Sequence, residues 1–197
     1  MNNISIIPIN NLPEFEPKHD LADELVKSFS SNNFVLEDKD IIVITQKIVS
    51  KVEDRLIKND NESIEKLIQQ ESLEILRKRG DTVIARTKHG FICANAGIDK
   101  SNIEKGSVLL LPEDPDKTSR DIRKKIEHVT NKKISIIISD TFGRAWRKGQ
   151  TNVAIGSSGI QPLESYIGEK DAFDNELFAT EIAIIDELAG AAELVMK

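Results

Sequence analysis

The chain has only one cysteine, Cys93, which excludes an internal disulfide and a cysteine-based zinc site. No run of about eighteen apolar residues is present, so the sequence predicts no membrane helix. Acidic residues outnumber basic ones, with 33 Asp+Glu against 27 Lys+Arg and a net charge of −6. This argues against nucleic acid as the main partner, because phosphate backbones favour a basic surface. The N-terminus lacks the charged and apolar blocks of a signal peptide. We therefore expect a cytoplasmic protein.

What remains is a composition suited to a packed globular unit. Of the 197 residues, 39% are hydrophobic and 30% are charged, which allows a real core and excludes wholesale disorder. No internal repeat, low-complexity tract or linker divides the chain, so we expect one unit over residues 1–197.

Hydrophobic periodicity predicts mixed α and β structure without regular βαβ alternation. Helices are expected from Asp20 as N-cap, from the loop at 58–62 through about Arg79, from Thr118 with Asp121 as a capping-box variant, and over 186–197. Strands are expected at 4–9, 40–45, 82–87, 91–94, 107–111 and 134–138, and residues 143–168 form a Gly-rich region. The fold class predicted is α+β.

The segment at residues 139–149 carries the strongest chemical signal because it directly follows a buried strand, where ligand sites are common. Asp140 is a hard oxygen ligand suited to Mg²⁺ or Mn²⁺, and Thr141 could add a hydroxyl oxygen. Arg144, Arg147 and Lys148 could hold phosphate or carboxylate oxygens. The alternative is a surface turn with solvated bases, and the local sequence favours neither.

Two further segments follow apolar strands. If Asp99 meets Asp140 in space, the two carboxylates could share one nucleotide-bound metal, although a turn-capping role for Asp99 is more frequent. Lys47 and Lys51 are four residues apart, so on a helix they could reach one polyanion, although solvated lysines are the commoner case. His89 is predicted to be a surface histidine and Cys93 a small core residue. The sequence contains neither a Walker A nor a Rossmann glycine pattern, so any nucleotide site is of another kind.

Laid out in order, these segments resemble the coenzyme F-420-0:L-glutamate ligase family, whose members are γ-glutamyl ligases of deazaflavin coenzyme biosynthesis. The resemblance runs through residues 12–13, 20–22, 46–53, 89–102, 110–112, 114–116, 139–144, 146–147 and 154–156. Several long motifs in the right order make this a specific signal.

The resemblance implies GTP-dependent ligation of L-glutamate to the phospholactyl arm of the deazaflavin precursor, through an activated carboxylate. It implies a fold of two intertwined α+β subdomains in a homodimer, and Mg²⁺ or Mn²⁺ as cofactor with K⁺ as a further candidate ion. By the match, the metal and catalytic residues are Asp99, Asp140 and Thr141. The GTP-binding residues are Leu12, Pro13, Glu14, Phe15, Gln46, Lys47, Lys51 and Asn102, and we assign Arg144, Arg147 and Lys148 to the substrate.

One departure from the family is expected at the C-terminus, where members continue past the final helix into a strand-rich segment that this chain lacks. Two other functions therefore stay open from the sequence. One is a non-catalytic paralogue that keeps the GTP and metal groove. The other is a related ligase that joins an amino acid to a different phosphorylated acceptor.

Overall fold

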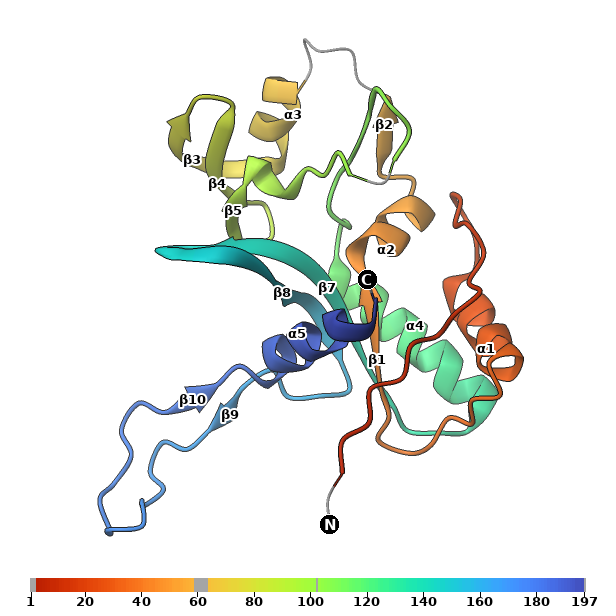
Figure 1. Cartoon of the computed structure of the whole chain (residues 1–197), viewed down its shortest axis with the longest axis vertical. Coiled ribbons are helices and arrows are strands. Elements are labelled where there is room, and N and C mark those ends of the chain that lie inside the picture. The colour runs from red at the N-terminus through yellow and green to blue at the C-terminus, as the bar shows by residue number, and fades with distance from the viewer. Residues whose placement is uncertain (1–2, 59–63, 102, 197) are drawn as a thin grey trace.

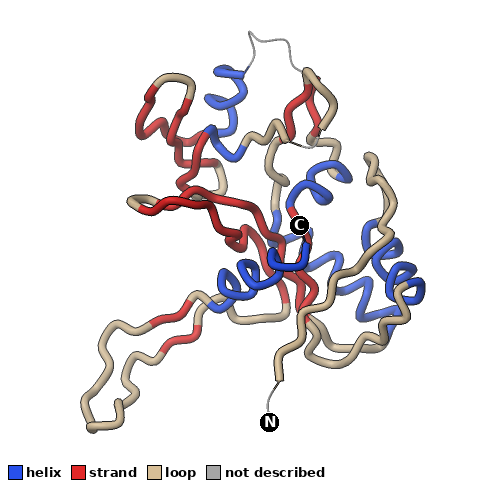
Figure 2. The backbone as a smooth tube through the Cα atoms, in the orientation of Figure 1, coloured by secondary structure: helices blue, strands red, loops and turns tan. Residues whose placement is uncertain are grey.

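The computed structural model describes residues 3–58, 64–101 and 103–196 and confirms the α+β class (Figures 1 and 2). The helices are α1 (Leu21–Ser31), α2 (Gln46–Val52), α3 (Ile64–Glu71), α4 (Pro115–Thr130) and α5 (Ile184–Met196), with a 3-10 turn, η1, at Asn95–Gly97. The strands are β1 (Ile41–Thr45), β2 (Leu56–Lys58), β3 (Ser72–Arg79), β4 (Thr82–Thr87), β5 (Ile92–Ala94), β6 (Ser107–Leu109), β7 (Ser135–Arg144), β8 (Arg147–Ser158), β9 (Glu164–Ser165) and β10 (Glu181–Ile182). The division into two intertwined subdomains stays a prediction.

The main core lies on a three-stranded sheet of order β1-β7-β8, in which β1 is parallel and β8 antiparallel to β7. Three consecutive isoleucines of β7, Ile136, Ile137 and Ile138, are fully buried, which is typical of a strand covered on both faces. α4 packs on β7 and β8, and α1 packs on α4. The resulting hydrophobic cluster holds the buried part of β7 in place. It thereby positions the polar residues at the other end of this strand.

Helix α1 begins where the sequence predicted, because Asp20 accepts a hydrogen bond from the backbone N–H of Asp23. Helix α4 begins earlier than predicted. Its N-cap is Asp114, which accepts from the N–H of Lys117, and Pro115 occupies the first turn. The Thr118 start was wrong because proline at N1 suits a helix and does not break it.

Helix α5 confirms the predicted terminal helix and packs on β8. The outer edge of β8 is held by two carboxylates from neighbouring helices. Asp186 of α5 accepts from the N–H of Ala154, and Asp116 of α4 accepts from the N–H of Ser157, both at 2.8 Å. These backbone donors of an edge strand are therefore satisfied by side chains.

A second sheet of order β3-β4-β5 has its own small cluster with α3, formed by Ile68, Val83, Ala85 and Ala96. The predicted helix through Arg79 is wrong after Glu71, because residues 72–79 form β3 and pair with β4. Leu73 lies at a register shift of β3 and is exposed, and Ile75 and Leu76, predicted for the apolar face of the helix, are also partly exposed on this strand. Tertiary pairing here overrides the helical pattern.

Strand β7 is longer than predicted and continues through the motif that was expected to follow it. β7 and β8 form a long hairpin, paired from Ile136↔Ser158 to Arg144↔Arg147. The predicted Gly-rich region is therefore largely strand β8, followed by an arm built on β9 and β10 that projects from the body (Figure 1). The predicted strand at 4–9 is wrong, because residues 3–9 are extended without strand pairing.

Gly156 lies where α4 approaches β8 most closely. A Cβ at this position would lie 2.5 Å from the backbone carbonyl carbon of Pro115, so helix and strand must separate to admit it. We expect Gly156→Ala to lower the free energy of unfolding by about 1–3 kcal/mol. Gly190 in α5 is the matched control, because its nearest neighbour lies at 3.7 Å and alanine favours helix. Thermal unfolding of both variants tests this; equal stability changes would contradict the tight α4–β8 approach.

Candidate functional site

The end of the main sheet brings together charged residues from separate parts of the chain. Lys47, in the first turn of α2, forms an ion pair with Asp99, which follows η1, with Nζ–Oδ2 at 2.7 Å. Both side chains are largely withdrawn from solvent, at 30% and 21% exposed. Burial opposes ionisation of Asp99, but hydrogen bonds from Lys47 and from the N–H of Ser101 hold its pKa below the usual range. Asp99 therefore stays ionised.

Asp140 on β7 is the second carboxylate of this group. Burial raises the pKa of Asp140 to about 6; the N–H of Thr141 and the charge of Lys47 lower it, and the negative charge of Asp99 raises it further. Burial, together with the charge of Asp140, raises the pKa of the Cys93 thiol on β5 to about 11. Asp140 is thus within electrostatic range of Lys47 on α2, Asp99 after η1 and Cys93 on β5.

The Thr141 hydroxyl does not join this group. Successive side chains of a strand point to opposite faces, and Thr141 Oγ1 donates to Asn152 Oδ1 at 2.7 Å. Asn152 in turn donates to Glu193 of α5 at 2.9 Å. The backbone N–H of Thr141, in contrast, donates to Asp140 Oδ1 at 2.8 Å.

A cavity of about 400 Å³ lies beside the predicted nucleotide residues and is lined by Glu14, Phe15, Lys51, Leu56 and Ile103, among others. Lys51 Nζ forms an ion pair with Glu14 across it. Phe15 is buried and packs in the main core, which anchors the irregular segment at 12–15. The 12–15 segment and α2, far apart in sequence, are therefore neighbours.

Leu12 is partly buried against the main core, and Pro13 follows it in the same irregular segment. Gln46 is fully buried; its Oε1 accepts from Ser50 Oγ at 2.8 Å, and its Nε2 has no hydrogen-bond partner among the described residues. Asn102, also predicted to bind GTP, lies outside the residues that the structure describes.

The three basic residues assigned to the substrate lie at the tip of the β7–β8 hairpin. Arg144 folds over the turn, donating to the carbonyl oxygens of Lys148 at 2.8 Å and Gly149 at 3.2 Å. Arg147 begins β8, and Trp146 between them is fully exposed with a left-handed φ of 58°. The tip presents cations and an aromatic ring to solvent.

Asp99 and Asp140 are the acidic residues of this group that could serve a divalent ion. No cluster of three or more His, Cys, Asp or Glu side chains suited to a metal occurs within the described ranges. Mg²⁺ and Mn²⁺ are commonly held by one or two carboxylates, with phosphate and water oxygens completing the shell, so these two residues are the candidates for such an ion. Within the described residues, no helix combines the length and the apolar character that a bilayer span requires.

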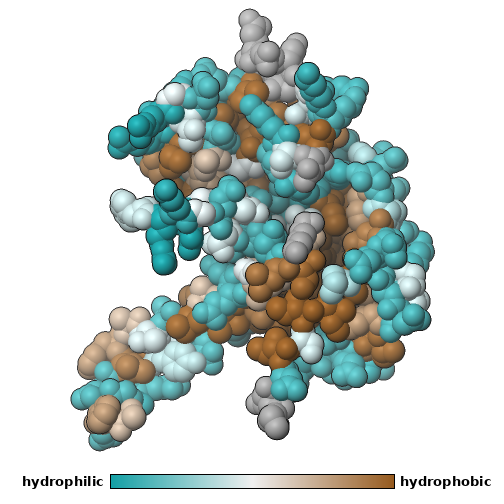
Figure 3. Space-filling model, viewed as in Figure 1, coloured by the Kyte–Doolittle hydropathy of each residue, from teal (hydrophilic) through white to brown (hydrophobic). Residues whose placement is uncertain are grey.

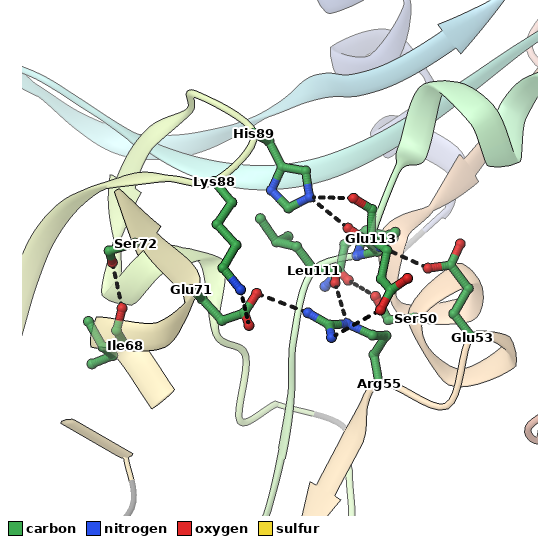
Figure 4. A network of polar contacts seen from close by, with 12 residues as sticks. Ser50, Glu53, Arg55, Ile68, Glu71, Ser72, Lys88, His89, Leu111 and Glu113 are labelled. Carbon is green, nitrogen blue, oxygen red and sulfur yellow. Dashed lines mark hydrogen bonds and ion pairs between the residues drawn. The ribbon is translucent and has the colours of Figure 1, made fainter. Parts of the chain in front are cut away.

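The sequence did not predict how two residues, His89 and Cys93, relate to the candidate site. His89, expected at the surface, is half-buried, and its Nε2 lies 2.8 Å from the carbonyl oxygen of Pro112 (Figure 4). Cys93 was expected only as a core residue, and the structure adds its proximity to Asp140. In both cases the signal was their place in the 89–102 segment, which also carries Asp99.

The fold and this site define an α+β protein that gathers a carboxylate pair and a lysine at one end of a mixed sheet. The family model described as F420-0:Gamma-glutamyl ligase matches residues 10–66 and 59–197, and the chain belongs to this family. It is 44% identical to coenzyme F420:L-glutamate ligase of Methanococcus maripaludis strain S2, over 84% of this chain and 73% of the relative. The enzyme of the same name from Methanocaldococcus jannaschii is also 44% identical, over 83% and 72%.

Proposed function

We propose that this protein is a GTP-dependent ligase that joins L-glutamate to the deazaflavin precursor F-420-0. The observation that carries the proposal is the ion pair of Lys47 with Asp99, whose charges both act on Asp140 from a third segment of the chain. Membership of the family and the named relatives support glutamate ligation as the reaction class.

The residues have distinct roles in the proposal. Asp99 and Asp140 hold Mg²⁺ or Mn²⁺, which when bound neutralises phosphate charge and fixes the γ-phosphate near the acceptor. Lys47 and Lys51, released from Asp99 and Glu14, pair with the triphosphate, and the 12–15 segment and Gln46 border the nucleotide. Asn102 is a further proposed contact. Thr141 contributes through its backbone N–H, or through its hydroxyl if the bond to Asn152 opens.

The proposed reaction has two steps. The precursor's terminal carboxylate attacks the γ-phosphorus of GTP, giving an acyl phosphate and GDP, and the glutamate amine then displaces phosphate with loss of a proton. A second glutamate can be added through the γ-carboxylate. Arg144, Arg147 and Lys148 bind the precursor's phosphodiester or the glutamate carboxylates, for which their exposed cations are suited.

Calorimetric titration with GTP, with and without Mn²⁺ and with ATP as control, tests the nucleotide site. We expect GTP to bind only with the metal, and ATP to bind at least tenfold more weakly. Glutamylated product in a following turnover assay with the precursor supports the ligase. Metal-dependent GTP binding without product indicates the non-catalytic paralogue, and product with another acceptor indicates the related amino-acid ligase. Added K⁺ tests the further candidate ion.

We further propose that the protein forms a homodimer and that the β9–β10 arm contributes to the contact. The arm projects from the body and carries apolar side chains (Figure 3), with Phe173 86% and Phe178 78% exposed. Such exposure on a projecting element is typical of an interaction surface. We expect Phe173→Ser with Phe178→Ser to shift the sedimenting species from dimer to monomer. A dimer unchanged by both substitutions places the contact elsewhere.

A further inference from the structure

His89 joins the β4–β5 turn to the segment that precedes α4. Its Nε2 lies 2.8 Å from the carbonyl oxygen of Pro112 and 3.0 Å from that of Glu113 (Figure 4). Both neighbours are acceptors, so Nε2 carries the hydrogen and donates to them. Nδ1 is buried and has no hydrogen-bond partner among the described residues. The geometry therefore fixes one tautomer and one ring orientation.

The oriented ring continues into a stack that reaches β7. His89 stacks on Phe91 with centroids 6.0 Å apart and an interplanar angle of 23°, and Phe91 meets Phe142 edge to face at 6.0 Å and 72°. Phe91 precedes Cys93 by two positions, and Phe142 follows Asp140 by two. Residues two apart on a strand share a face, so Phe142 lies on the same face of β7 as Asp140. Phe91 directly precedes β5, which packs on β7, so the stack runs along the β5–β7 contact.

The segment that His89 holds is also the segment that places Asp99. The backbones of Asp99 and Leu109 exchange two hydrogen bonds of 2.9 Å. Between the two attachments, Gly97 lies against Leu111 so closely that a Cβ would come within 2.6 Å of its side chain. His89 therefore bonds to one end of the 109–113 segment, at residues 112–113. Asp99 bonds to the other end, at Leu109.

We propose that His89 is a positioning residue that sets Asp99 against Asp140, acting through the Phe91–Phe142 stack and through the 109–113 segment. The inference rests on the proposed metal site, and it assigns His89 no contact with substrate. Groups that orient metal ligands from behind affect metal affinity by about 10–100-fold when removed. A donor at the Nε2 position is the property that matters.

Mn²⁺ titration without nucleotide tests the metal part. We expect His89→Ala to weaken Mn²⁺ binding by about tenfold and to lower kcat more than it raises the KM for glutamate. His89→Gln, whose amide can donate from a similar place, restores binding to within about threefold. His128→Ala is the control, because His128 is exposed on the last turn of α4. Unchanged Mn²⁺ affinity in His89→Ala overturns the inference.

A second measurement does not depend on the proposed function. Cys93 is the chain's one cysteine, so its alkylation rate in the metal-free protein reports the β5–β7 contact. We expect His89→Ala to accelerate alkylation at least tenfold, with His89→Gln and His128→Ala near the original rate. Phe142→Leu serves where His89→Ala fails to fold, and it should also accelerate the reaction. Unchanged rates overturn the positioning role, whereas absent Mn²⁺ binding in the unsubstituted protein with the expected alkylation pattern overturns only the metal site.

Discussion

Asp140→Asn should lower turnover by about 100–1,000-fold, the loss typical of removing one preorganised electrostatic group from an active site. The amide keeps the shape of the side chain and one oxygen, so it can still accept the 2.8 Å bond from Thr141 N–H. It lacks the charge that a divalent ion requires. Initial rates of glutamylated product, measured at saturating GTP and Mn²⁺, check this. Turnover within a few fold of the original would contradict the placement of Asp140 in the site.

The same substitution should stabilise the fold. Burial raises the pKa of Asp140 to about 6, so the folded protein binds a proton more tightly than the unfolded chain. Stability from this group is present below pH 3.8 and is lost as the pH rises through about 6. At pH 7.5 we expect Asp140→Asn to gain about 1 kcal/mol and about 2–4 °C in Tm, with little difference near pH 4. A lower Tm at pH 7.5 would contradict the unfavourable burial of this charge.

Proton and metal compete for Asp140 in the proposed site, so the affinity for Mn²⁺ should depend on pH. Because ligands must be deprotonated, Mn²⁺ affinity should increase as the pH rises through about 6. Titrations at several pH values measure this, and Asp116→Asn, outside the proposed site, is the control. An affinity that does not change across this range would contradict Asp140 as a ligand.

Lys47→Met should separate metal binding from catalysis. In the structure Lys47 Nζ lies 2.7 Å from Asp99 Oδ2 and neutralises that carboxylate. Without the lysine, the site is more negative and Asp99 has no competing cation, so Mn²⁺ alone should bind about 3–10-fold more tightly, a change of about 1 kcal/mol. GTP affinity and turnover should fall by at least about tenfold, because a charge-assisted contact to phosphate is lost.

Calorimetry with Mn²⁺ alone and then with GTP resolves the two effects. Lys124→Met is a suitable control, since Lys124 is an exposed lysine of α4 remote in sequence from the site. If Lys47→Met weakened Mn²⁺ and GTP binding equally, Lys47 would be holding the shape of the site and not pairing with phosphate. If neither changed, Lys47 would take no part in metal or nucleotide binding.

Elements with strong local signals could be predicted from the sequence. The Asp20 cap, the apolar run of β1 and the isoleucines of β7 each specify their structure within a few residues. β3 could not be predicted, because its residues suit a helix and only pairing with β4 makes them a strand. The length of β7 was also hidden, since Gly143 and the charged residues after it are typical of a loop and are held in a strand by β8.

The sequence indicated candidate site residues one by one and left their arrangement open. Carboxylates and lysines after apolar strands indicated phosphate and metal chemistry, and their spacing could not show that Lys47 pairs with Asp99. It also could not show that the side chains of Asp140 and Thr141 take opposite faces, because that required knowing that β7 continues through them. The residue pattern of the sequence does not determine which distant segments come into contact.

The two carboxylates that bind the edge of β8 also protect the protein from aggregation. An open edge strand can recruit a strand from another molecule, and repeated recruitment leads to fibrils. Asp186 and Asp116 occupy the N–H groups of Ala154 and Ser157 that an incoming strand would need. They also bring negative charge to that edge, so extending the sheet there requires stripping both acids from their donors. The native fold is therefore hindered from self-associating by adding a strand at β8.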